Sequence, residues 1–333
     1  MLQIDGGTDG GGVLQGDGDP LCSVPRNSAY TLEEPPNNAL TTSSLRAVWG
    51  SSTSDVWTAG DDGVLLHFDG TAWSRSPAVT TQSLRALFGT GPSDVWATGD
   101  GGTLLHWNGS GWSASEPGTQ ANLLAVWATA GYAVAVGAGG TIVENTGSGW
   151  VAASSGTTTD LAAVWGRSSG EVYAAGPSIA VRKLSAWSPI LQFPVPAFPG
   201  TTLDALGIFG KGASGVLIDG GLWNGSVWTR LVPSFPAPTH NTALVSLQVR
   251  SVWSDGGDVW ATAKVDVLVS SEDPAGPSLY RDTGGCWSDE VPSGPIWGNL
   301  ELLPVDGFHA VFGLGPHDVY AVGDLGVIAH VRP

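Results

Sequence analysis

Basic residues and aspartates recur in step along this chain, and they are its clearest candidates for ligand chemistry. Three basic residues are each followed by an aspartate 15 residues later: Arg46 and Asp61, Arg85 and Asp100, His309 and Asp324. A guanidinium grips a carboxylate through its planar fork of N–H donors. The spacing therefore predicts ion pairs, each inside one structural unit.

The two positions of such a pair also become apolar together. Leu124 and Ala162 stand where the basic residue is expected, and Ala138 and Pro177 stand where the aspartate is expected. Covariation of this kind within one chain is what a direct contact between two positions produces. We therefore expect the paired residues to meet in space, near the mouth of a central channel.

One basic residue, Arg250, departs from the rule because Lys264 occupies the position of its aspartate, with Asp266 nearby as a substitute. Two interpretations of the whole set stay open. The pairs hold the rim of the molecule together, at ~0–1 kcal/mol each where they are exposed. Alternatively, the basic residues present donors to an anionic or sugar ligand. The second interpretation names these ligand-binding residues: Arg46, Arg85, Arg250 and His309.

The other ionisable residues indicate structure rather than catalysis. Histidines recur near the end of the third strand, where we expect them to be hydrogen-bonded structural residues, with a glutamate at the equivalent place in one unit: His67, His106, His330 and Glu144. Aspartates open the preceding strand after a Gly/Ser turn, where capping of an Asx turn explains them: Asp55, Asp94, Asp258 and Asp318. No trio has the spacing of one zinc site. The sequence predicts neither a metal nor another cofactor.

All these residues belong to a repeat of about 40 residues. LRAVWGSSTSDVWTAGDDGVLLHFDGTAW at 45–73 returns 39 residues later as LRALFGTGPSDVWATGDGGTLLHWNGSGW at 84–112. Such a period, with several short apolar runs, is typical of a propeller or an array. Each unit divides into four short strands separated by Gly, Ser, Asp and Asn turns. One aromatic residue marks the first strand of every unit: Trp49, Phe88, Trp127, Trp165, Phe209, Trp253 and Phe312.

The expected fold is all-β, a seven-bladed β-propeller of four-stranded antiparallel blades over residues 28–333. The last unit ends at Pro333 without a fourth strand, while AYT at 29–31 resembles AWS at 72–74 in a closing strand. We therefore expect Tyr30 to supply the outer strand of the seventh blade and to close the ring. Residues 1–27 are rich in Gly and Asp and are expected to form a flexible acidic tether.

The connections between units lengthen toward the C-terminus. From a closing aromatic residue to the next marker residue, the spacing is 15 in the first units and 22 to 25 in the later ones. In a propeller these connections leave one face, so we expect a binding surface over blades five to seven. Folding back of the loop aromatics over their own blades is the alternative. Trp297, outside the repeat, leads these candidate ligand-binding residues: Phe193, Phe198, Phe235, His240 and Trp297.

The chain has two cysteines, Cys22 and Cys286. Cys286 precedes the closing Trp of blade six, and Cys22 lies eight residues before Tyr30. The two outer strands would be neighbours in a closed ring. We therefore expect a disulfide between them if the protein is exported.

The run GDGGTLLHWNGSGW at 99–112 resembles the repeats of secreted bacterial propellers. Its Gly-Thr-x-aliphatic strand, polar-Gly turn and closing Trp are similar to those of sialidase-type Asp-box propellers and photosystem II assembly-factor propellers. The resemblance covers residues 28–333 and implies the fold. The Asp-box order S-x-D-x-G-x-T-W is not reproduced, and the sialidase catalytic residues have no matching positions. The acidic leader resembles the linker of bacterial surface lipoproteins, which implies a lipid anchor.

Composition narrows the classes of partner. The 333 residues carry 13 Lys plus Arg against 30 Asp plus Glu, a net charge of −17. Nucleic acid is excluded because phosphate binding needs a basic face. No apolar run approaches the ~18 residues of a membrane span.

These observations favour a non-catalytic binding or scaffold propeller, exported to the bacterial surface or beyond, whose ligand is a glycan or a protein. The alternative is a carbohydrate-active enzyme, a glycosidase or lyase that uses the channel mouth. Its candidate residues are Asp61, Asp100, Asp324, Arg46, Arg85 and His309. An enzyme needs convergent groups of perturbed pKa in a cleft, whereas these polar residues are distributed as pairs.

Overall fold

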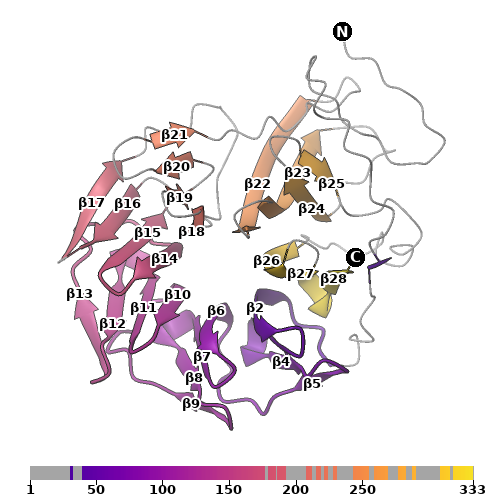
Figure 1. Ribbon diagram of the computed structural model, residues 1–333, viewed down its shortest axis with the longest axis horizontal. Coiled ribbons are helices and arrows are strands. Elements are labelled where there is room, and N and C mark those ends of the chain that lie inside the picture. The colour runs from indigo at the N-terminus through magenta and orange to yellow at the C-terminus, as the bar shows by residue number, and fades with distance from the viewer. Residues whose placement is uncertain are drawn as a thin grey trace.

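The computed structural model describes residues 31–32, 40–176, 179–184, 186–192, 208–211, 215–218, 221–223, 228–230, 243–254, 259–268, 277–282, 287–289, 308–315 and 318–332. Within these ranges the chain is all-β, apart from single turns of 3-10 helix, and its strands form seven four-stranded sheets. Figure 1 shows these sheets arranged around a common centre.

The first four sheets follow one another along the chain, and each is an antiparallel meander. The first two contain β2 (Leu45–Ser52), β3 (Asp55–Gly60), β4 (Leu65–Phe68) and β5 (Trp73–Arg75), then β6 (Leu84–Gly91), β7 (Asp94–Gly99), β8 (Leu104–Trp107) and β9 (Trp112–Ala114). The next two contain β10 (Leu123–Thr129), β11 (Tyr132–Gly137), β12 (Ile142–Asn145) and β13 (Trp150–Ala153), then β14 (Ala163–Ser168), β15 (Glu171–Gly176), β16 (Ile179–Lys183) and β17 (Trp187–Gln192).

Three further sheets complete the described part of the chain. Two are β18 (Ile208–Lys211), β19 (Gly215–Ile218), β20 (Gly221–Trp223) and β21 (Trp228–Arg230), then β22 (Ala243–Ser254), β23 (Val259–Leu268), β24 (Pro277–Asp282) and β25 (Trp287–Asp289). The last is β26 (Phe308–Gly315), β27 (Asp318–Gly323), β28 (Ile328–Arg332) and β1 (Thr31–Leu32).

The last sheet joins the two ends of the described chain. Thr31 pairs with Arg332 and Leu32 with Val331, antiparallel. The sequence placed this strand around Tyr30, which lies outside the described residues together with the predicted tether at 1–27. The observed strand begins one residue later.

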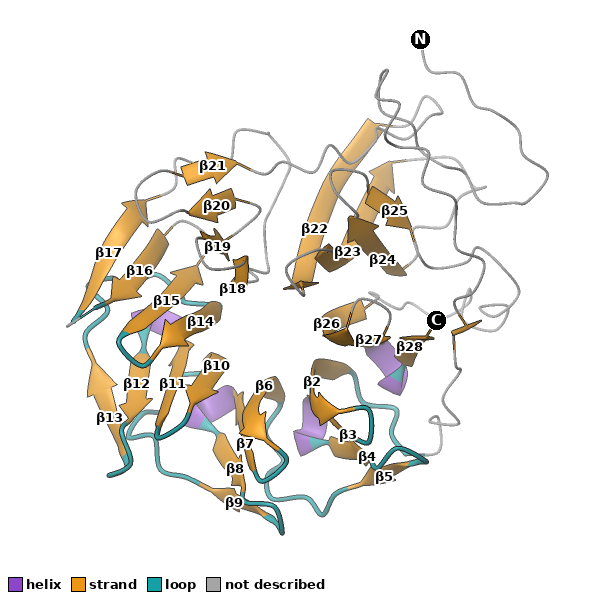
Figure 2. Cartoon of the chain, in the orientation of Figure 1, coloured by secondary structure: helices purple, strands orange, loops and turns teal. Residues whose placement is uncertain are grey.

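The first strand of each sheet contacts its counterpart in the next. These contacts run from β2 to β6, β10, β14, β18, β22 and β26, and β26 in turn contacts β2. The second strands are buried on both faces: all residues of β3 except Asp55 are buried, and so is the whole of β11. A strand covered on both sides needs no polar alternation. This explains the apolar runs of the sequence, and Figure 2 shows the sheets placed side by side around the centre.

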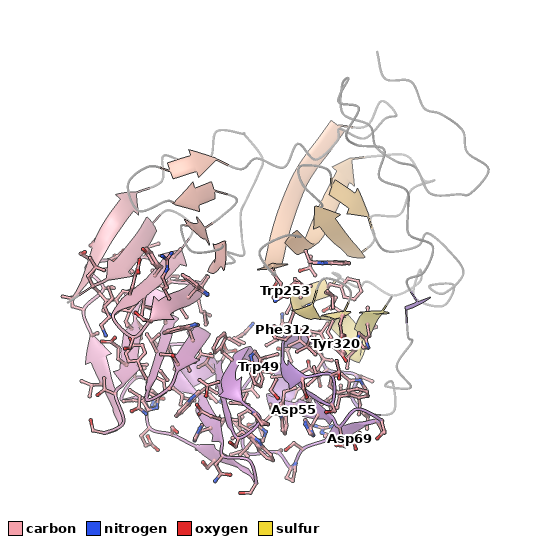
Figure 3. The ribbon with its side chains drawn as sticks, in the orientation of Figure 1. Trp49, Asp55, Asp69, Trp253, Phe312 and Tyr320 are labelled. Atoms are coloured by element: carbon pink, nitrogen blue, oxygen red, sulfur yellow. The ribbon has the colours of Figure 1, made fainter. Side chains whose placement is uncertain are left out.

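Tryptophans fill the spaces between sheets. Trp57 of β3 lies between two tryptophans of the second sheet, with ring centroids 4.8 Å from Trp107 and 5.2 Å from Trp112. Trp96 repeats the edge-on contact one sheet later, 5.2 Å from Trp150. Such pairs add to the area that they bury. The repeated tryptophans are therefore the packing framework of the fold, and Figure 3 shows Trp49 and Trp253 on either side of Phe312.

No helix among the described residues is long and apolar enough to cross a membrane.

Candidate functional site

In five of the seven described sheets, a β-bulge places one side chain of the first strand at the inner edge of the sheet. In β2 the pairing with β3 passes from Leu45 to Ala47 and skips Arg46. A bulge leaves the extra residue unpaired and re-aims its side chain. The register skips the same position in the other sheets that show the bulge there: Arg85, Leu124, Arg250 and His309. We call these bulged residues, with Ala162 at the start of the fourth sheet and the turn residue that faces each, the inner rim.

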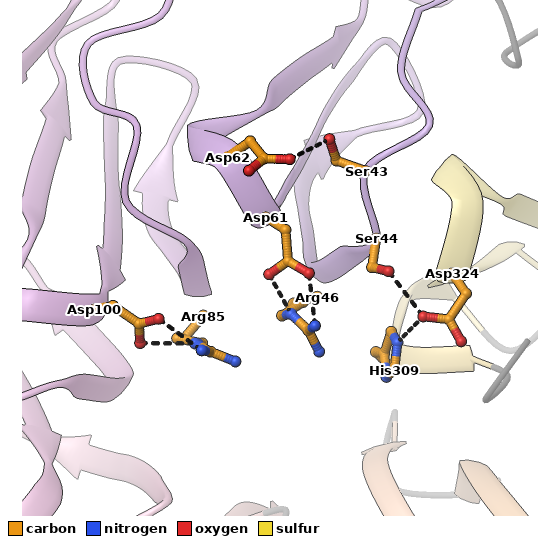
Figure 4. Close-up of polar contacts among 9 residues, drawn as sticks. All are labelled: Ser43, Ser44, Arg46, Asp61, Asp62, Arg85, Asp100, His309 and Asp324. Atoms are coloured by element: carbon orange, nitrogen blue, oxygen red, sulfur yellow. Dashed lines mark hydrogen bonds and ion pairs between the residues drawn. The ribbon is translucent and has the colours of Figure 1, made fainter.

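The two arginines of the inner rim hold their aspartates through two hydrogen bonds each. Arg46 donates from Nε and Nη2 to the Asp61 carboxylate, both at 2.6 Å. Arg85 does the same to Asp100 at 2.9 and 2.7 Å. Both predicted pairs are therefore present (Figure 4). In the described part of the chain, neither Nη1 has a hydrogen-bond partner, and the arginine side chains are 29% and 33% exposed.

The electrostatics of the first pair follow from its geometry. The hydrogen bonds from Arg46 hold the pKa of Asp61 below its ordinary value, against the opposing effect of burial. The same bonds raise the pKa of Arg46. Both groups are therefore charged at neutral pH, and Asp61 is a poor proton donor.

The third predicted pair is smaller and more enclosed. His309 Nε2 lies 2.7 Å from Asp324 Oδ1, and the two side chains are 13% and 16% exposed. Ser44 donates from Oγ to the same oxygen at 2.9 Å. Ser44 precedes β2 of the first sheet, and Asp324 follows β27 of the last sheet. This hydrogen bond therefore connects the first sheet to the last.

The turns that carry the aspartates also fasten neighbouring sheets. Each is a single turn, and four turns at this position are described. Three begin with an aspartate: η3 (Asp61–Gly63), η4 (Asp100–Gly102) and η8 (Asp324–Gly326). The fourth, η5 (Ala138–Gly140), begins with an alanine. The amide of Gly101 donates to Asn122 of the next unit at 2.9 Å, and that of Gly139 donates to Asp160 at 2.8 Å. The rim therefore has a fixed shape, which a binding site requires.

Among the described residues, the inner rim is charged over three neighbouring sheets and apolar over the next two. Figure 4 shows Arg85, Arg46 and His309 in a row, and their strands β6, β2 and β26 are in contact. On the third and fourth sheets the equivalent positions are Leu124 and Ala162, both half-buried, as the sequence indicated. The turn facing Leu124 begins with Ala138 instead of an aspartate.

Several predicted site residues lie beyond what the structure describes. The backbone of Arg250 is bulged as in the other sheets, and its side chain is not described. These further residues lie outside the described residues: Phe193, Phe198, Phe235, His240, Trp297, Cys22 and Cys286. Their predicted roles stay predictions.

A second series of pairs lies at the other ends of the sheets. The sequence predicted hydrogen-bonded structural histidines there, which is confirmed, but it did not predict that their partners are aspartates. His67 Nε2 lies 2.7 Å from Asp55 Oδ1, and His67 stacks on Trp57 with centroids 4.3 Å apart. His106 lies 2.8 Å from Asp94. His330 lies 2.5 Å from Asp318.

In Asp55 and Asp94 one carboxylate oxygen contacts the histidine and the other accepts a bond from the hydroxyl of Ser51 or Thr90, so the predicted Asx capping was wrong there. For Asp318, capping stays a prediction, and Asp258 is not described. The signal was available, because each aspartate precedes its histidine by 12 residues.

The third unit replaces this second pair by a different one. Tyr132 occupies the position of the aspartate and donates from its hydroxyl to Glu144, which occupies the position of the histidine. Lys183 of the fourth sheet adds an ion pair to Glu144 at 2.5 Å and lies 4.6 Å from the Tyr132 ring centroid. Burial, and then the bond to Glu144, raise the pKa of Tyr132. These contacts connect the third sheet to the fourth.

No group of side chains that could bind a metal ion occurs among the residues that the structure describes.

Comparison with known proteins identifies the fold of this chain. No family model matches the chain, and no curated protein matches it. Among solved structures, YCF48 bound to a D1 peptide is similar with a TM-score of 0.61 at 18% identity, over 91% of this chain and 97% of that one. The WD40 β-propeller domain of Doa1 is similar with a TM-score of 0.62 at 12% identity, over 92% and 97%.

A third similar structure is the extracellular domain of a putative one-component system from B. thetaiotaomicron. It has a TM-score of 0.64 at 13% identity, and the match covers 90% of this chain and 40% of that one. At such identities the likeness shows the fold alone. The chain has a β-propeller fold, which confirms that part of the sequence prediction, while the likeness to sialidase-type propellers stays a prediction.

Proposed function

We propose that this protein is a non-catalytic binding or scaffold propeller of seven blades in a closed ring, with an anionic or sugar group of its ligand held at the inner rim. One observation carries the proposal. The bulges of β2 and β6 place Arg46 and Arg85 on the rim, with Nη1 unpartnered among the described residues and the rest of each guanidinium fixed by an aspartate. Fixed donors of this kind bind a ligand without first being ordered.

A closed ring is the arrangement that supports such a rim. The contacts of the first strands return from β26 to β2, and Ser44 bonds to Asp324 across the same junction. The pairing of β1 with β28 gives the last sheet its fourth strand. We propose that this strand is the outer strand of the seventh blade.

The state of Asp61 favours binding over catalysis. A glycosidase needs a carboxylic acid of raised pKa to protonate its leaving group. The pKa of Asp61 is lowered by Arg46. Each rim aspartate is also engaged by a basic side chain: Asp61 by Arg46, Asp100 by Arg85 and Asp324 by His309. We therefore propose that the protein is not an enzyme, and keep a carbohydrate-active enzyme as the alternative.

The ligand that we propose is a glycan or a protein outside the cytoplasm. The long Pro-rich connections are expected over blades five to seven. We propose that they lie on the same face as the inner rim, because each connection leads into the start of a first strand, where the rim residues are. Trp297 would extend the site from the rim onto those loops. The acidic Gly-rich leader and the two cysteines support an exported or surface-bound protein.

A glycan array and an extracellular protein array, each probed with wild type and three variants, test the proposal. Trp297→Ala tests the loops and Arg85→Ala tests the rim. The double variant Arg85→Leu with Asp100→Ala also removes the arginine, but it leaves no carboxylate unpaired because it copies the Leu124 and Ala138 pair of the third unit. It therefore controls for any effect of the unpaired Asp100 in Arg85→Ala. We expect binding that both rim variants weaken. Binding that none of them changes would contradict the proposal, and glycan turnover would establish the enzyme alternative.

A further inference from the structure

The division of the inner rim into a charged arc and an apolar arc restricts the chemistry of the ligand. The charged arc is formed by the bulged residues Arg85, Arg46 and His309 with their aspartates. The apolar arc is formed by Leu124 and Ala162. The strand contacts β2 to β6, β6 to β10 and β10 to β14 make the two arcs continuous around the rim.

The charged arc offers donors to an anion of low charge. Each arginine uses Nε and Nη2 for its aspartate, and the Nη1 donors remain. The charges of the two arginines are already balanced by Asp61 and Asp100, and the exposed Asp62 adds a further carboxylate on the same turn, where it accepts a bond from Ser43. An excess of carboxylates repels a dianionic phosphate more than a monoanion. A single carboxylate is the better match.

The apolar arc offers a surface for a hydrocarbon group beside that carboxylate. The same bulge that projects Arg46 and Arg85 projects Leu124, so its side chain stands at the equivalent place one sheet further on. Leu124 is half-buried, and the first residue of its facing turn, Ala138, has no polar side chain. The nearby carboxylate of Asp160 is exposed, with one oxygen occupied by the Gly139 amide. Burial of an apolar group against Leu124 is favourable in proportion to the area covered.

We infer that the inner rim binds a carboxylate with an adjacent apolar group, with the carboxylate at Arg46 and Arg85 and the apolar group at Leu124. This inference rests on the proposed function and narrows it. Two sources supply that chemistry: the C-terminus of a polypeptide whose last side chain is apolar, and a free aliphatic carboxylic acid. A neutral glycan lacks the carboxylate and has few apolar groups to cover Leu124.

Fluorescence anisotropy with labelled peptides tests the inference on the full chain. Three peptides share one sequence and end in leucine with a free carboxylate, in leucine amide, and in serine with a free carboxylate. Hexanoate is added as a competitor to separate the two sources. We expect the leucine acid to bind about 10-fold more tightly than its amide, as a charge-assisted hydrogen bond predicts. We also expect it to bind more tightly than the serine acid.

Two reciprocal variants exchange the arcs with pairs that the chain already uses. Arg85→Leu with Asp100→Ala extends the apolar arc and should abolish the preference for acid over amide. Leu124→Arg with Ala138→Asp extends the charged arc and should abolish the preference for leucine over serine. Thermal unfolding of each variant shows that it is folded before binding is measured.

The outcomes separate the inference from the function on which it rests. Competition by hexanoate assigns the site to a free carboxylic acid, and its failure beside tight binding of the leucine acid assigns it to a chain terminus. Equal binding of acid and amide overturns the inference. So does the absence of all peptide and hexanoate binding when an array ligand still responds to the rim variants, and in that case the proposed function stands. Array binding that ignores the rim variants overturns both.

Discussion

Gly89 packs directly against the indole ring of Trp49 in the preceding sheet. An alanine at position 89 would place its Cβ only 2.6 Å from Cη2 of that ring. Trp127 packs against Gly166 in the same way, and a Cβ at position 166 would lie 2.5 Å from the indole ring of Trp127. Phe88 and Phe209 are smaller residues at the position of Trp49. In the unit that follows each of them, the position equivalent to Gly89 is Ala128 or Ser254 instead of glycine.

Gly89→Ala should therefore destabilise the protein by about 1–3 kcal/mol, the usual cost of an overpacked interior. The Trp49 side chain is buried and lies against Phe312, and the added Cβ would also lie 2.8 Å from the backbone oxygen of Asp94. The free energy of unfolding from urea denaturation measures the loss.

The double variant Trp49→Phe with Gly89→Ala copies the Phe88 and Ala128 combination and should cost less than the two single changes together. Gly91→Ala is the control, because a Cβ there meets nothing within 4 Å. If Gly89→Ala and Gly91→Ala lose the same free energy of unfolding, the contact with the Trp49 ring is not the cause of the loss.

The rim pair Arg46–Asp61 should make stability depend on pH in the acid range. The pKa of Asp61 is lower in the folded protein than in the unfolded chain, where it is near its ordinary value. Its stabilising contribution is then complete above the unfolded pKa of about 3.9 and is lost as pH falls through the folded pKa. We expect Arg46→Leu with Asp61→Ala to cost roughly 1 kcal/mol at pH 7 and less at pH 2.

Urea denaturation of this double variant and wild type at both pH values measures the difference. A difference between the two proteins that is unchanged from pH 7 to pH 2 would show that the ion pair is not its source.

Much of the fold and part of the site could be predicted from the sequence, because both follow from comparison of the repeats with one another. The spacing of the repeats predicts the strands, and covariation between the repeats predicts the pair of Arg46 with Asp61. The bulge at Arg46 could not be predicted, because it depends on which backbone groups pair in the folded sheet. The pair of Asp55 with His67 could have been found by the same comparison, since Tyr132 and Glu144 replace both members together in the third unit.

The carboxylate of Asp69 should titrate far below the ordinary range for aspartate. Its Oδ1 accepts bonds from the Thr71 hydroxyl at 2.6 Å, the Thr71 amide at 2.8 Å and the Ala72 amide at 2.9 Å. The Thr71 hydroxyl bond and the two amide bonds lower the pKa of Asp69 to about 2. An NMR titration of the side-chain carboxyl carbon should give a midpoint near that value in wild type and a higher one in Thr71→Val.

Asp69→Asn is the matched substitution for this turn, because Asn108 makes the same three contacts in the second unit. We expect this variant to keep the turn but to be slightly less stable than wild type at pH 7, because the lowered pKa of Asp69 means that its charge stabilises the fold there. The difference should shrink as the pH falls toward 2, and thermal unfolding at the two pH values measures it. A difference that does not change with pH would show that the charge of Asp69 is not its source.

The ion pair between Lys183 and Glu144 should be costly to break and cheap to replace as a whole. Both side chains are largely buried, at 16% and 18% exposure, and Tyr132 donates to the same glutamate. Glu144→Gln leaves the lysine charge without its counterion between the third and fourth sheets, and we expect a loss of about 2–4 kcal/mol. Glu144→Gln with Lys183→Met removes that uncompensated charge and should recover part of the loss, since apolar replacement of both ions avoids their desolvation. Urea denaturation of the three proteins decides the point. If the double variant is no more stable than Glu144→Gln alone, the buried charge is not what the ion pair compensates, and the cation–π contact of Lys183 with Tyr132 carries the junction instead.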